Sequence, residues 1–136
     1  SAARLLDYSQ PEQVLEAAEE YFRSENFTGA SPLLKALSDL PASPTQTRAA
    51  LLLGYAEFYR SHWTEAAKLL TEWINMHKSH PGAPDAFYRL GQAYMFMGYY
   101  REAKQCLDGA LALDPNLAGT QPFEAVFRLV EDFSSE

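Results

Sequence analysis

This sequence of 136 residues has no long apolar run, no cysteine pair and no cluster of positive charge. No apolar stretch approaches the roughly 20 residues that a membrane-spanning helix needs, so direct membrane insertion is not expected. Cys106 is the only cysteine, which excludes an intramolecular disulfide. A single thiol in a helix is usually a small buried apolar group. It favours a reducing compartment, and we expect a cytoplasmic protein, with a periplasmic or envelope-associated location left open.

No secretory signal is visible at the start of the chain. The first residue is Ser1 rather than methionine, which is what removal of a leader or trimming of the chain would leave.

The charge of the chain argues against nucleic acid as a partner. The net charge is −7, and by segment residues 1–41 carry −4, 42–84 carry +1, 85–120 carry −1 and 121–136 carry −3. A phosphate backbone would be repelled by the acidic ends, and no basic stripe offsets that repulsion.

No constellation of residues points to catalysis or to a cofactor. The sequence has neither a strained nucleophile turn nor a glycine-rich phosphate loop. His77 and His80 are three residues apart at a predicted helix end, where histidine also favours the helix dipole, and no cysteine or acidic ligand is close in sequence. We therefore expect no catalytic residue, no metal site and no cofactor, and the chain is not predicted to be an enzyme.

Composition and patterning predict one folded all-α domain over residues 1–136. Hydrophobic residues make up 47% of the chain and charged residues 21%, which is typical of a globular protein. No segment alternates with the period of two that marks a strand. The length suits a single domain with its own core.

The most informative feature is an internal repeat. Ala66 follows the pair Leu53-Gly54 at the same spacing at which Ala103 follows the pair Leu90-Gly91. The glycines, these alanines and the pair Leu70 and Leu107 are each 37 residues apart. A period of this length is typical of stacked helical hairpins, which are usually binding scaffolds.

Seven helices are expected. Ser9 is predicted to cap the first, with Glu12 closing a capping box and Pro11 in the first turn. Ser31 and Pro32 suit the cap and first turn of the second. Phe123, Val126, Phe127 and Val130 are predicted to form the inner face of the last, which has no following partner and an acidic outer side. The expected helices run from Ser9 to about Ser24, from Ser31 to Leu40, from Thr45 or Thr47 to Tyr59, from Thr64 to about Lys78, from about Asp85 to Met97, from about Arg101 to Leu113, and over residues 120–133.

These residues resemble the tetratricopeptide repeat family, whose helix-turn-helix unit is about 34 residues long. The third repeat carries the family pattern throughout: Phe87, Leu90-Gly91, Tyr94, Tyr100, Ala103, Leu107, Ala110 and Pro115. The second repeat departs from it, with Glu57 where tyrosine is usual and Trp73 where alanine is usual. The first repeat is degenerate. The resemblance implies an α-solenoid with repeats at about 11–44, 45–81 and 84–117 and a capping helix at 120–133.

The small residues of the repeat have a physical explanation. Gly54 and Gly91 on first helices, and Ala66 and Ala103 on second helices, are expected where the two helices of a hairpin approach most closely. A larger side chain there would overpack the contact and cost roughly 1–3 kcal/mol or more.

The resemblance also implies a partner-binding groove, because the first helices of this family line its concave side. Carried over by register, the groove-facing places are rich in aromatic residues. Aromatic and methionine side chains offer a large contact area at a small entropy cost. The predicted partner-binding residues are Phe22, Arg48, Tyr55, Phe58, Tyr59, Tyr88, Gln92, Met95 and Phe96.

Two interpretations of these aromatic residues stay open. They are core residues if the segment Ala2–Leu6 or the seventh helix covers them. If all were exposed, they would form a larger apolar patch than a monomer normally tolerates, and they would then receive a hydrophobic segment of another protein. Lys and Asn at groove places clamp a carboxylate in some members of the family, and their absence here argues against such a clamp.

The function predicted from the resemblance is that of a protein–protein interaction adaptor or small chaperone. Arg48 and Arg89 are expected to flank the groove and select an acidic residue of the ligand. A short array of this kind resembles bacterial secretion-system chaperones and assembly modules of bacterial envelope machinery. The alternative is a structural module that forms a homodimer through its aromatic surface.

Overall fold

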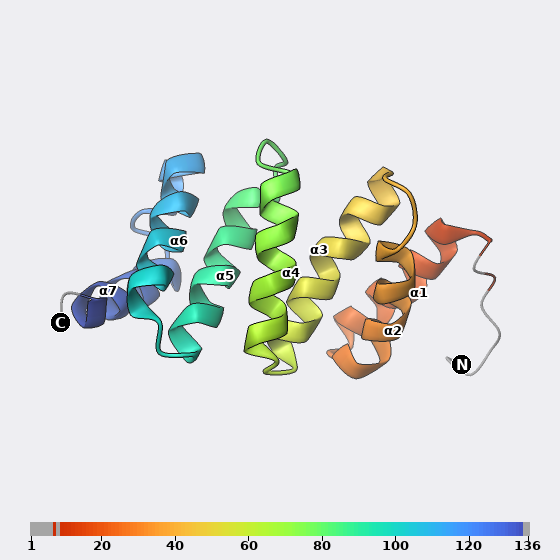
Figure 1. The fold of residues 1–136 in the computed structure, drawn as a ribbon, viewed down its shortest axis with the longest axis horizontal. Coiled ribbons are helices and arrows are strands. Elements are labelled where there is room, and N and C mark those ends of the chain that lie inside the picture. The colour runs from red at the N-terminus through yellow and green to blue at the C-terminus, as the bar shows by residue number, and fades with distance from the viewer. Residues whose placement is uncertain (1–6, 8, 135–136) are drawn as a thin grey trace. The chain divides into compact units, whose positions relative to one another are not determined.

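The computed structural model describes residue 7 and residues 9–134 as an all-helical chain, in which the described residues contain no strand (Figure 1). The chain divides into two compact units, residues 1–62 and 63–136. The elements are α1 (Pro11–Arg23), α2 (Phe27–Ser38), α3 (Pro44–Tyr59), α4 (Trp63–Met76), α5 (Ala83–Phe96), α6 (Tyr100–Leu113), the short 3₁₀ helix η1 (Pro115–Leu117) and α7 (Phe123–Ser134). In the first unit, α1 packs against α2 and both contact α3; in the second, α5 contacts α4, α6 and α7. The all-α prediction is confirmed.

The capping box predicted at the first helix is wrong. Gln10, not Ser9, is the N-cap of α1, and no side chain caps the helix. Ser9 instead donates to the carboxylate of Asp7 through both its backbone N–H, at 2.9 Å, and its hydroxyl. The Gln10 side chain donates to the same carboxylate at 3.1 Å. Asp7 therefore organises the turn before the helix and takes the hydroxyl that would otherwise cap it.

The predicted start of the second helix is also wrong. Asn26 caps α2 by accepting from the backbone N–H of Gly29 at 2.9 Å, so Pro32 lies inside the helix. Proline there lacks the N–H that would reach the carbonyl of Thr28, and Thr28 is an exposed residue. Ser31 is buried and donates its hydroxyl to Glu57 at 3.0 Å. The serine is thus a tertiary contact between α2 and α3.

A residue in the left-handed conformation follows each of α1, α3 and α5. These residues are Glu25, with φ of 58°, Ser61, with φ of 63°, and Gly98, with φ of 83°. Only Gly98 has the residue type that prefers this conformation. Within the two units, Glu25 lies in the short turn between α1 and α2, and Gly98 lies in the short turn between α5 and α6.

The close helix–helix contact predicted from the repeat is present in the third hairpin. A Cβ atom added at Gly91 would lie 2.9 Å from Leu107 Cδ2 and 3.2 Å from the carbonyl oxygen of Ala103. Leu107 is fully buried, so it has little room to yield. Gly91 therefore allows α5 and α6 to approach each other at the density of a protein core.

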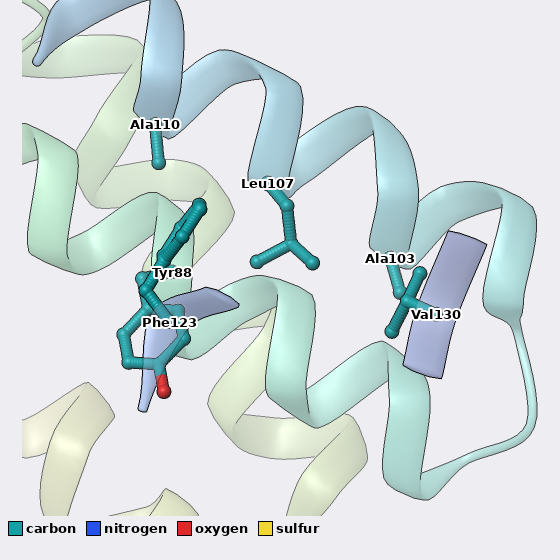
Figure 2. Packing of buried hydrophobic residues seen from close by; sticks show 6 residues of the cluster. All are labelled: Tyr88, Ala103, Leu107, Ala110, Phe123 and Val130. Carbon is teal, nitrogen blue, oxygen red and sulfur yellow. The ribbon is translucent and has the colours of Figure 1, made fainter. Parts of the chain in front are cut away.

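The core of residues 63–136 continues onto the last helix, as the sequence predicts. Phe123 and Val130 are buried with Leu107 and Tyr88 (Figure 2). Val126 and Phe127 are partly buried and pack against this cluster. The predicted inner face of α7 is thereby confirmed. The segment Ala2–Leu6, which was the other candidate cover for the aromatic residues, lies outside the described residues.

Substitution of Gly91 by valine tests this contact. Since the new side chain would meet Leu107 and the Ala103 carbonyl, we expect G91V to lower the free energy of unfolding by at least about 1–3 kcal/mol. Urea denaturation followed by circular dichroism measures this. A112V adds the same side-chain type at an exposed position of α6 and should cost less than about 1 kcal/mol. Equal losses in the two variants would contradict the close-contact role of Gly91.

Candidate partner-binding surface

One aromatic ring of the first unit is presented to solvent on a stacked support. The ring of Tyr59, in the last turn of α3, stacks on Phe27, the first residue of α2, with centroids 4.8 Å apart and planes inclined by 20°. Phe22 at the end of α1 meets the Phe27 ring edge-on at 4.9 Å. Tyr59 still exposes 42% of its surface. Packing therefore holds this ring in place while part of its surface stays in contact with solvent.

The second unit contains the same arrangement twice. Phe96, in the last turn of α5, stacks on Trp63, the first residue of α4, at 4.5 Å and 19°. Phe133 of α7 stacks on Tyr100, the first residue of α6, at 4.9 Å and 23°. Phe96 is 53% exposed and Phe133 is 44% exposed. We refer to Phe27–Tyr59, Trp63–Phe96 and Tyr100–Phe133 as the three ring pairs.

The ring pairs follow the internal repeat of the sequence. Phe22, Tyr59, Phe96 and Phe133 are separated by successive intervals of 37 residues, the period of the glycines. The supporting rings Phe27, Trp63 and Tyr100 each begin a second helix. Sequence reasoning missed these supports and Phe133 as site residues, although the 37-residue spacing extended to the last helix would have found Phe133.

The nine predicted site residues differ widely in exposure. Arg48, Tyr59 and Phe96 are exposed, whereas Phe22, Gln92 and Met95 are half-buried. The side chains of Tyr55, Phe58 and Tyr88 are buried and offer a partner little surface in this conformation. The contact role of all nine stays a prediction, and the exposed rings are its strongest members.

The burial of Tyr88 has an identified cause. Its ring lies 5.3 Å from that of Phe123 on α7, within the core that the last helix completes (Figure 2). The interpretation in which the seventh helix covers aromatic residues therefore holds at this position.

The two predicted selectivity cations have partners within the chain. Arg48 Nε lies 3.3 Å from the carboxylate of Glu19, linking α3 to α1. Arg89 donates to the side-chain oxygen of Gln92 at 3.0 Å, and its guanidinium lies 5.2 Å from the centroid of the Tyr88 ring. An acidic ligand would have to compete with these contacts, so the structure offers little support for selection of an acidic residue.

A polar network in the first unit occupies the place where the family usually has tyrosine. The Glu57 carboxylate accepts from Ser31 at 3.0 Å, from Arg60 at 3.0 Å and pairs with His62 Nδ1 at 3.1 Å. Burial by itself raises the pKa of Glu57, but the hydrogen bonds from His62 and Ser31 and the charge of Arg60 outweigh it, so the pKa lies below 4.5. The network ties α2 to α3 and to the turn that follows.

The equivalent place in the second unit is a shallow depression. The four network residues Ser31, Glu57, Arg60 and His62 have counterparts 37 residues further along the chain, which are Lys68, Tyr94, Met97 and Tyr99. These four counterparts line a hollow of about 510 Å³ between α4 and α5. The two units therefore use one repeat position in different ways, as an ion-paired contact and as an aromatic-lined hollow.

The remaining reactive side chains are built into the packing. Burial, with a smaller contribution from the Glu102 carboxylate, raises the pKa of the Cys106 thiol to about 12. Trp73 contacts the rings of His77 and His80, at 4.8 and 5.0 Å between centroids. Among the described residues, no group of three or more His, Cys, Asp or Glu side chains could hold a metal ion. None of the described helices is long and apolar enough to cross a membrane.

The hairpins and their repeated ring pairs define an α-helical repeat protein. Models of the tetratricopeptide repeat match residues 15–84 and residues 84–117, and the first match alone spans more than half of the chain. The chain therefore belongs to the tetratricopeptide repeat family. No curated protein matches the sequence.

Several solved structures have a similar fold. The TPR domain of P58(IPK) has a TM-score of 0.78 and 17% identity over 92% of this chain, which spans only 34% of that one. PcrH from Pseudomonas aeruginosa has a TM-score of 0.68 and 18% identity, covering 96% of this chain and 92% of its own. A mutant of MamA has a TM-score of 0.73 and 20% identity, covering 99% and 68%. At these identities the likeness shows the fold alone.

Replacement of Glu57 by glutamine tests the polar network. The depressed pKa of Glu57 means that its ionised form stabilises the folded state. This contribution to the free energy of unfolding is fully present above about pH 4.5 and is lost as pH falls through the pKa of Glu57 in the folded state. At pH 7 we expect E57Q to unfold about 1–2 kcal/mol more easily because charge-assisted hydrogen bonds are lost. The difference from wild type should shrink as pH falls below 4.5 and vanish once Glu57 is protonated in the folded protein. A difference that is constant from pH 7 to pH 3 in denaturant titrations would contradict this role.

The reactivity of Cys106 gives a second test. Because the thiolate is the nucleophile, a pKa of about 12 predicts modification by a disulfide reagent at pH 8 that is on the order of a thousandfold slower than for free cysteine. Absorbance of the released thiol measures the rate. The same protein in guanidinium should react at the rate of free cysteine, and fast modification of the folded protein would show that the thiol is accessible.

Proposed function

We propose that this protein is an interaction adaptor or small chaperone that binds apolar side chains of another protein through the exposed ring of each ring pair. The observation that carries the proposal is the recurrence of one arrangement. Tyr59, Phe96 and Phe133 occupy the same repeat position, each stacks on a supporting ring, and each keeps more than two fifths of its surface exposed. Core packing alone does not require these rings to be half open.

The ring pairs have the physical properties of a binding surface. An aromatic ring held on one face loses little conformational freedom when a ligand covers its other face, so the entropy cost of binding is reduced. Aromatic side chains also provide much of the binding energy at protein interfaces. Each ring pair therefore offers a prepared contact for an apolar side chain.

The comparisons support a role in binding proteins rather than in catalysis. Members of this repeat family are generally interaction modules that use extended surfaces. PcrH, whose fold is similar, has been solved in complex with the chaperone binding regions of PopD and of PopB. The match between this chain and PcrH in the PopD complex covers 98% of this chain and 97% of the PcrH chain, with a TM-score of 0.71. This similarity in fold and length supports the proposal of a small chaperone.

Substitution of two exposed rings tests the proposal. We expect Y59S/F96S to reduce capture of partner proteins from a lysate of the native host by about thirtyfold, since each exposed aromatic contact is worth more than about 1 kcal/mol. Capture is measured by affinity pull-down and quantitative mass spectrometry. Circular dichroism of the variant should remain that of the wild type.

A matched control separates the ring pairs from apolar surface in general. Met76 and Leu113 are also exposed apolar side chains, with 72% and 45% of their surface open, but neither belongs to a ring pair. M76S/L113S should therefore keep full capture. Equal losses in both double variants would overturn the proposal, and so would dimerisation of the pure wild-type protein through these rings, seen by light scattering and abolished in Y59S/F96S.

A further inference from the structure

The last helix exposes an apolar stripe on the side away from its buried face. Ala125, Leu129 and Phe133 follow one another at intervals of four residues, which places them on one side of α7. All three are exposed, and Leu129 leaves 45% of its surface open to solvent. Phe123 and Val130 form the opposite, buried side. The helix therefore has two apolar sides. The exposed side is partly packed as well, because Phe133 stacks on Tyr100 of α6, whereas Ala125 and Leu129 are exposed.

The repeat register shows what kind of surface this stripe is. Leu129 and Phe133 stand 37 residues after Gln92 and Phe96, which are predicted groove-facing places on α5. Helix α5 also contacts α7. Arg128 stands where Gly91 allows α6 to approach α5. The stripe therefore has the register of the predicted groove-facing places and not that of the close helix–helix contact.

The charge of α7 indicates the chemistry of that ligand. The helix carries three carboxylates, Glu124, Glu131 and Asp132, against one guanidinium, Arg128, for a net charge of −2. Arg128 is engaged with Glu124 at 2.7 Å. By the same count α5 and α6 are each neutral. Asp132 lies between Leu129 and Phe133 in sequence and borders the stripe at helical spacing.

We propose that the stripe Ala125–Leu129–Phe133 binds a partner segment in which apolar side chains are flanked by lysine or arginine. This inference rests on the proposed function and specifies the ligand that α7 adds to it. Opposite charge would favour such a segment. A second copy of the chain is disfavoured, because a two-fold contact through α7 would bring its net negative charge against itself.

Two synthetic helical peptides of 14 residues test the charge preference. Each carries two leucines four residues apart, flanked in one peptide by four lysines and in the other by four glutamates. Fluorescence anisotropy with the full chain should show that the lysine peptide binds at least about fivefold more tightly at low salt. Added salt should reduce that preference.

Two variants with matched controls locate the binding on α7. L129S should weaken the lysine peptide about fivefold or more, whereas L113S, which removes an equally exposed leucine from α6, should not. D132K should reduce or reverse the charge preference, whereas E102K, with the same change in net charge at an exposed position of α6, should not. If D132K loses helicity, D132N provides the same test with a smaller effect.

The outcomes of this experiment are distinct from those of the proposed function. Equal binding of the two peptides, or equal effects of the α7 variants and their controls, would overturn the inference about α7, even where Y59S/F96S still abolishes capture of host proteins. A concentration-dependent dimer that L129S dissociates would overturn it as well, by showing that the stripe binds a second copy. Loss of preference in L129S and D132K alone supports it.

Discussion

The stacking of two aromatic rings at successive helix pairs is the contact on which the candidate surface depends. In each ring pair, the supporting ring begins a helix: Phe27 begins α2, Trp63 begins α4 and Tyr100 begins α6. The supported rings Tyr59 and Phe96 end α3 and α5, and the supported ring Phe133 lies near the end of α7. This arrangement is compatible with stability because half of each exposed ring is still removed from water. It also holds the open half in one orientation. Packing and binding are therefore two consequences of the same contact, which is why simple removal of a ring needs a control for folding.

The two units have chemically different residues at one position of the repeat. Where the family usually has tyrosine, the first unit has Glu57, and its carboxylate is held by Ser31, Arg60 and His62. The second unit keeps Tyr94 at this position and leaves a hollow beside it. A half-buried carboxylate such as that of Glu57 is acceptable only when its hydrogen bonds outweigh the cost of its desolvation. The direction of the Glu57 pKa indicates that they do.

Much of the fold could be predicted from residues whose role is local or periodic. The 37-residue spacing of Gly54 and Gly91 predicts the hairpins, and the apolar spacing from Phe123 to Val130 predicts the buried side of the last helix. The caps could not be assigned in the same way. Ser9 and Ser31 both have the residue type of an N-cap, but Asp7 binds the first and Glu57 the second. Hydroxyl groups bond to whichever acceptor the fold brings within reach, and a pattern of residue types does not contain that information.

The candidate site also has features that the sequence predicts and features that only the tertiary structure decides. The repeat in the sequence alone determines that aromatic rings recur at Phe22, Tyr59, Phe96 and Phe133, because helical hairpins of constant length return each position to an equivalent place. Only the tertiary structure decides which rings are open. Tyr88 is on the same helix as Phe96, yet Phe123 of α7 covers the first while Trp63 supports the second and leaves it exposed. Exposure depends on which distant segment lies against a side chain, and that is a property of packing in three dimensions rather than of spacing along the chain.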